Sequence, residues 1–71
     1  MYSLVFEMED KKILQADVNI SEDRYRSYIQ KLQDNINLEN AINITDVDGD
    51  VLIVNARKLI NLSVCTLKES N

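Results

Sequence analysis

Histidine, proline and tryptophan are absent from the sequence, and glycine and cysteine each occur once. Without histidine, neither a Ser-His-Asp triad nor a Cys-His pair can form. The single glycine, Gly49, cannot build a glycine-rich phosphate-binding loop. Cys65 has no second thiol for an internal disulfide, which fits a reducing cytosol. These absences predict a cytoplasmic protein that is not an enzyme and binds no cofactor or metal ion.

Long apolar runs and positive net charge are also missing. No apolar stretch approaches the roughly 20 residues that span a membrane, so no membrane association is expected. The net charge of −4 argues against binding to a nucleic-acid backbone as the main task. At 45%, hydrophobic residues are too abundant for a disordered chain. We therefore expect residues 1–71 to form a single domain, whose small size favours association with a second copy or a partner.

Two segments of alternating polarity near the start predict a β-hairpin. In residues 2–8, every second side chain is apolar, and residues 13–20 repeat the alternation. A period of two residues is typical of a strand with one buried face. The polar residues 9–12 suit the turn between the two strands.

A helix is predicted from about residue 22 to 35. Ser21 occupies a suitable N-cap position, where its hydroxyl could accept a hydrogen bond from the first turn. An apolar stripe follows at spacings of three and four residues, formed by Tyr25, Tyr28, Ile29, Leu32 and Ile36. We expect the helix to end in the segment 35–40, where asparagine can adopt the left-handed conformation.

Residues 41–67 are expected to hold three further strands. Asp48-Gly49 is a strong signal for a two-residue hairpin turn. Such a turn would pair Val47 with Asp50, Thr45 with Leu52, and Ile44 with Ile53. Because residues 51–54 are apolar on both faces, we expect a central strand there. The last strand is predicted at Leu59–Leu67.

The predicted order of elements is thus ββαβββ. The fold class is α+β, with a small antiparallel sheet of about five strands and one helix packed on it. A small closed barrel is the alternative, because several short strands can curl.

Asp46, Asp48 and Asp50 superficially resemble a calcium loop. An EF-hand, however, needs glycine at loop position 6 and glutamate at position 12, whereas this segment places Gly49 at position 4 and Arg57 at position 12. We interpret the three carboxylates as parts of a tight turn. Cys65, in an apolar strand, is interpreted as an inert, half-buried thiol.

Two kinds of surface are candidates for binding another protein. The first is formed by aromatic and basic side chains, Tyr25, Arg26 and Tyr28 on the helix and Arg57 and Lys58 before the last strand. The second is a sheet edge, since strands 13–20 and 59–67 carry few charges that would block pairing. Such an edge also favours a homodimer.

In style, this short acidic chain rich in asparagine and isoleucine is similar to many accessory proteins of bacteriophages and mobile elements in low-GC bacteria. That resemblance implies a binder that inhibits or modulates a host protein by occupying its surface. The alternative is a protein that binds or sequesters a ligand such as a nucleotide, or a nucleic acid.

Overall fold

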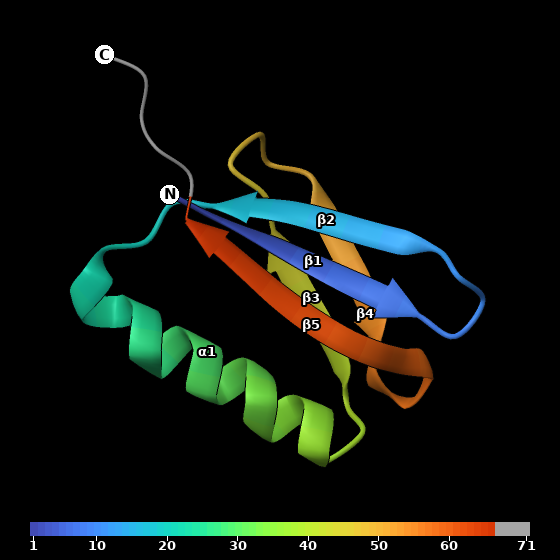
Figure 1. The fold of residues 1–71 in the computed structure, drawn as a ribbon. Coiled ribbons are helices and arrows are strands. Elements are labelled where there is room, and N and C mark those ends of the chain that lie inside the picture. Colours follow the sequence, from blue (N-terminus) through green and yellow to red (C-terminus); the bar gives the residue numbers. More distant parts are fainter. Residues whose placement is uncertain (67–71) are drawn as a thin grey trace.

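The computed structural model describes residues 1–66. Its elements confirm the α+β class and the predicted order of strands and helix (Figure 1). In chain order they are β1 (Tyr2–Met8), β2 (Ile13–Val18), α1 (Glu22–Asn37), β3 (Ala41–Thr45), β4 (Val51–Asn55), the short 3-10 helix η1 (Ala56–Lys58) and β5 (Leu59–Thr66).

β1 is the central strand of a three-stranded antiparallel sheet with the order β2-β1-β5. Its register pairs Phe6 with Leu14 of β2 and with Leu62 of β5, so these three side chains share one face. On this inner face Leu4 and Phe6 are completely buried. The alternation that predicted the first hairpin therefore places the apolar side of β1 at the centre of the core.

β3 and β4 form a separate two-stranded hairpin that lies behind the three-stranded sheet in Figure 1. Its inward side chains, Ile42, Ile44 and Val54, are buried in the same cluster as Phe6. Two antiparallel layers thus pack their apolar faces against each other.

A pair of hydrogen bonds joins the two layers at one edge. The backbone N–H of Asp17 in β2 donates to the Asp46 carboxylate (Oδ2) at 3.0 Å, and the N–H of Val47 donates to the Asp17 carbonyl at 3.0 Å. The outward-facing peptide groups of Asp17 are thereby satisfied at an edge that would otherwise face water.

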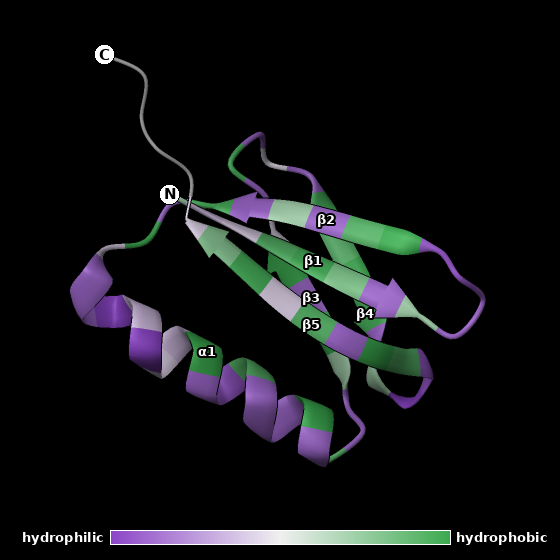
Figure 2. Cartoon of the chain, viewed as in Figure 1, coloured by the Kyte–Doolittle hydropathy of each residue, from purple (hydrophilic) through white to green (hydrophobic). Residues whose placement is uncertain are grey.

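Helix α1 lies on the same side of the three-stranded sheet as the β3–β4 hairpin and turns its apolar stripe inward (Figure 2). Leu32 is buried, and Ile29 and Ile36 pack beside it. The Tyr25 ring stacks on the Tyr2 ring of β1, with the centroids 4.3 Å apart and the planes inclined at 24°. The predicted stripe is therefore confirmed as the packing face of the helix.

The ends of α1 differ from the prediction in detail. Ser21 is the N-cap residue, but its hydroxyl makes no capping hydrogen bond. The helix continues to Asn37 and ends with Glu39, not an asparagine, in the left-handed conformation at φ 58°. The N–H of Asn40 then donates to the Asn35 carbonyl at 2.9 Å, which satisfies an acceptor of the last turn.

The predicted register of the β3–β4 hairpin is wrong by one residue. The observed pairs are Thr45–Val51, Ile44–Leu52, Asn43–Ile53, Ile42–Val54 and Ala41–Asn55. The loop contains three residues, because Gly49 N–H donates to the Asp46 carbonyl at 2.9 Å and Asp46 N–H donates to the Asp50 carbonyl at 2.8 Å. Gly49 has φ 87°, as the last loop residue of a type I turn followed by a bulge requires.

The prediction of a central strand at residues 51–54 is also wrong. Among residues 1–66, β4 pairs only with β3, and the central position belongs to β1. The closed barrel is not supported either, because the strands of this part of the chain form two separate sheets. β2 ends at Val18, and the predicted end of the last strand at Leu67 lies outside the described residues.

Candidate functional site

The two tyrosines predicted for partner binding lie on the packing side of α1. Tyr25 is held by its stack on Tyr2. Tyr28 is half-buried, and this burial raises the pKa of its phenol above the ordinary value of 10.0. Arg26 is exposed on the same helix. The structure thus places Arg26 in solvent, while both aromatic rings are partly buried and pack against the core.

Arg57 and Lys58 lie in η1, at the corner between β4 and β5. The Asn55 side chain caps this turn by accepting a hydrogen bond from Arg57 N–H at 3.1 Å. The Arg57 guanidinium forms an exposed ion pair with Glu39 at 3.5 Å. The carbonyl of Lys58 accepts a hydrogen bond from Glu9 N–H at 2.9 Å, which fixes the corner against the end of β1. The corner therefore has a defined position next to the first hairpin.

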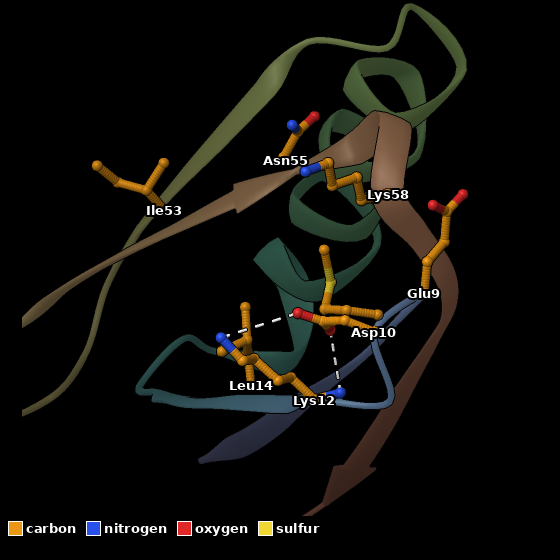
Figure 3. A pocket seen from close by; sticks show the side chains of 8 residues that line it. Glu9, Asp10, Lys12, Leu14, Ile53, Asn55 and Lys58 are labelled. Carbon is orange, nitrogen blue, oxygen red and sulfur yellow. Dashed lines mark hydrogen bonds and ion pairs between the residues drawn. The ribbon is translucent and has the colours of Figure 1, made fainter.

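An open cleft of about 540 Å³ lies between the β1–β2 turn and the end of β4 (Figure 3). Its apolar lining comes from Met8 and Leu14 on one side and Ile53 on the other. Charged side chains surround it, including Lys58 and an exposed pair between Lys12 and Asp10 at 3.8 Å. Of the predicted binding residues, Lys58 alone lines this cleft; Tyr25, Arg26, Tyr28 and Arg57 lie elsewhere.

The outward side of the β3–β4 hairpin carries no charged residue. We call this surface the outer hairpin face; it consists of Ala41, Asn43, Thr45, Val51, Ile53 and Asn55. Val51 is 63% exposed and Ile53 is 65% exposed, although both are large and apolar. The signal for this surface in the sequence is the run of apolar residues at 51–54, from which a central strand is predicted.

The free edge of β4 presents unpaired backbone groups. Because Asp46 N–H bonds to the Asp50 carbonyl, the next hydrogen-bonded pairs in the ladder are Ile44–Leu52 and Ile42–Val54. The peptide groups of the intervening residues in β4 then point away from β3; these residues are Val51, Ile53 and Asn55. In residues 1–66 no other strand pairs with this edge.

The aspartate cluster at the β3–β4 turn is occupied with backbone hydrogen bonds. The Asp46 carboxylate accepts one from Asp48 N–H at 2.8 Å and one from Asp17 N–H at 3.0 Å. These two donors lower the pKa of Asp46 below its ordinary value of 3.8. Within residues 1–66, no group of three His, Cys, Asp or Glu side chains lies close enough together to hold a metal ion.

Two further features bear on the sequence-based expectations. Cys65 is exposed in β5, so the expectation of a half-buried thiol is wrong; alternation along β5 turns it away from the core. In the part of the chain that the structure describes, no helix has the length and apolar character needed to cross a membrane.

Comparison of the chain with protein-family models, with curated proteins and with solved structures finds no significant match. The candidate functional surfaces of this protein are therefore the outer hairpin face, the β4 edge and the adjoining cleft.

Proposed function

We propose that this protein is a small, non-enzymatic, cytoplasmic binding module that occupies the surface of another protein through its outer hairpin face. Its acidic, asparagine- and isoleucine-rich composition fits an accessory protein of a phage or mobile element that inhibits or modulates a host protein in this way.

The observation that carries the proposal is the absence of charge on an exposed, apolar strand surface. Charged residues make up 28% of the chain, yet none lies on the outer hairpin face. Burial of a charged side chain in an interface carries a desolvation cost, whereas burial of Val51 and Ile53 is favourable. A rigid sheet surface of this kind suits a partner because it can be covered with little loss of conformational freedom.

A matched pair of double variants tests the proposal. V51T/I53T keeps the branched shape of both side chains and adds hydroxyl groups to the outer hairpin face. I13T/I60T makes the same kind of change at two positions outside that face, where Ile13 and Ile60 are each 59% exposed. Each variant is immobilised, and proteins captured from an extract of the source cell are identified by mass spectrometry.

We expect one host protein to be captured by the original chain and by I13T/I60T, and to be lost with V51T/I53T. Equal capture by both double variants would show that the host protein binds a surface other than the outer hairpin face. An Arg26→Ala variant in the same series tests whether the exposed side of α1 contributes to capture of the host protein. No specific capture by the original chain would contradict the proposal.

The cleft favours ligand binding as a second candidate function. Its volume of about 540 Å³ is within the range of small-molecule sites, and its apolar walls adjoin the ammonium groups of Lys12 and Lys58. A nucleotide would place its base on the apolar wall and its phosphates near the lysines. Nucleotides should raise the midpoint of thermal unfolding of the original chain and of V51T, but not that of Lys58→Gln. If no nucleotide raises the midpoint, that class of ligand is excluded.

A further inference from the structure

We propose that the free edge of β4 pairs antiparallel with β4 of a second copy of this chain, forming a continuous sheet with the strand order β3-β4-β4-β3. The inference builds on the proposed function, because it makes the outer hairpin face a surface shared by two copies.

The backbone of β4 is free to make such a ladder. Val51, Ile53 and Asn55 direct their N–H and C=O groups outward, and residues 51–55 include no charge and no proline. The register that places Ile53 opposite Ile53 of the second copy is the one that overlaps all five residues of the strand. It gives about six hydrogen bonds, two for each outward-facing pair. An open edge without charges or proline lacks the features that prevent edge-to-edge association.

The other edges of the molecule are less available. The β2 edge is blocked at Asp17 by its hydrogen bonds to the β3–β4 turn. β3 lies beside α1 on the side opposite β4. The first half of β5 lies beside α1, since Gln33 and Ile36 line a small pocket together with residues 59–62. β4 is therefore the edge that best supports an uninterrupted ladder.

The charges that flank β4 are complementary in this antiparallel arrangement. Asp48 and Asp50 precede the strand, whereas Arg57 and Lys58 follow it. With Ile53 at the centre, the acidic turn before β4 of one copy lies next to the basic corner after β4 of the other, and the same contact occurs again across the two-fold axis. A parallel arrangement would instead bring acids next to acids and bases next to bases. For a chain of net charge −4, the complementary ends offset part of the repulsion between two copies.

Pairing would also enlarge the outer hairpin face. In an antiparallel ladder, residues directly opposite each other project from the same face. Val51 and Ile53 of one copy would therefore adjoin Ile53 and Asn55 of the other. The resulting four-stranded surface is uncharged across its centre and twice as wide as the surface of one hairpin.

A charge-reversal experiment tests the pairing and its direction. The original chain is expected to sediment as a dimer. Asp48→Lys puts a positive charge in the turn, and Lys58→Glu puts a negative charge at the corner, so each brings like charges together at both contacts between turn and corner. Each variant should therefore dimerise about tenfold more weakly. A mixture of the two variants restores opposite charges at both contacts and should form a heterodimer more tightly than either variant dimerises alone. Added salt should reduce this difference.

An Ile53→Pro variant tests the backbone ladder itself. Proline removes an N–H that points away from β3, so the β3–β4 ladder is retained while the intermolecular ladder is broken. We expect a folded monomer by circular dichroism and sedimentation. Ile13→Pro, which changes the first residue of edge strand β2, is the matched control and should remain dimeric.

Failures of the two proposals are distinguishable. A monomeric original chain at its highest soluble concentration, a dimeric Ile53→Pro variant, or no heterodimer from the mixed charge variants would overturn the β4 pairing. If the original chain is monomeric yet V51T/I53T loses the captured protein, only the dimer is wrong. If the original chain is dimeric but V51T/I53T captures as well as I13T/I60T, only the proposed function is wrong.

Discussion

The two hairpins of this protein have the same kind of loop but different surroundings. In each, a residue before the three-residue loop donates its N–H to the residue after it and accepts a hydrogen bond from the last loop residue. The bonds are Met8–Lys12 and Lys11–Met8 in the first hairpin, and Asp46–Asp50 and Gly49–Asp46 in the second. Both last loop residues have positive φ, 69° at Lys11 and 87° at Gly49.

The difference lies in what completes each hairpin. β5 pairs with β1, so the first hairpin becomes part of a three-stranded sheet whose central strand is paired on both sides. No third strand in residues 1–66 joins the second hairpin, and its outer residues Val51 and Ile53 remain exposed. Local turn chemistry therefore forms both hairpins, but only the first is completed within the described chain. The binding surfaces that we propose lie on the second.

The largest expected contrast between the hairpins is in the free energy of unfolding. Phe6 in β1 is completely buried, so Phe6→Ala should destabilise the fold by about 3–5 kcal/mol. Ile53→Ala, on the outer hairpin face, should change the stability of the monomer by less than about 0.5 kcal/mol. Urea denaturation in dilute solution measures both.

Because Phe6→Ala removes much of the stability of a small domain, Phe6→Leu provides a milder variant. It should lose about 1 kcal/mol, since most of the buried volume is kept. Equal losses for Phe6→Leu and Ile53→Ala would contradict the assignment of β1 as the central core strand.

The contrast also explains which parts of the fold could be predicted. Residues 2–8 alternate because one face of β1 is buried, and the stripe on α1 has helical spacing for the same reason. Residues 51–54 are apolar on both faces, and that pattern cannot distinguish a buried central strand from an edge strand with an exposed apolar face. Which of the two is present depends on tertiary pairing that no local pattern specifies.

Turn details were harder to predict because they depend on single side chains. Asp48-Gly49 indicated a two-residue turn, but the Asp46 carboxylate accepts the Asp48 N–H and favours a loop one residue longer. The chain has only one glycine, so the left-handed positions at 11 and 39 are occupied by Lys11 and Glu39. Neither residue type indicates a left-handed conformation in the sequence. The cleft has no signal in the sequence because Leu14 and Ile53 come to line one cavity only in the folded chain.

The next contrast concerns Asp46, which joins the second hairpin to the first. Asp46→Ala removes the acceptor for both Asp17 N–H and Asp48 N–H, so we expect a lower midpoint of thermal unfolding at pH 7. The pKa of Asp46 is lowered in the folded state, so its contribution is fully present above the ordinary value of 3.8 and is lost as pH falls through the folded-state pKa.

The difference in the midpoint of thermal unfolding between Asp46→Ala and the original chain should therefore disappear at pH values below the folded-state pKa of Asp46. Asp50→Ala is the control, since the Asp50 carbonyl, not its side chain, takes part in the turn. A difference that persists unchanged in strong acid would show that Asp46 does not act through its carboxylate.

A smaller effect is expected at the loop of the second hairpin. Gly49 has φ 87°, and a Cβ added there would meet no atom within 4 Å. Gly49→Ala should therefore cost only backbone strain, about 1 kcal/mol. Gly49→Asn should cost less, because asparagine adopts left-handed conformations more readily. Chemical denaturation of both variants checks this order, and an equal loss for alanine and asparagine would mean that φ is not the cause.

The smallest expected effect is at the corresponding position of the first hairpin, and it has the opposite sign. Lys11 has φ 69° and is exposed, so Lys11→Gly removes backbone strain without loss of packing. Glycine also gains more freedom in the unfolded chain, which leaves a net stabilisation of about 0.5 kcal/mol. Lys12→Gly, at a neighbouring position outside the left-handed region, should destabilise instead. If Lys11→Gly and Lys12→Gly lowered the denaturation midpoint equally, the two hairpin loops would not share the geometry on which their comparison depends.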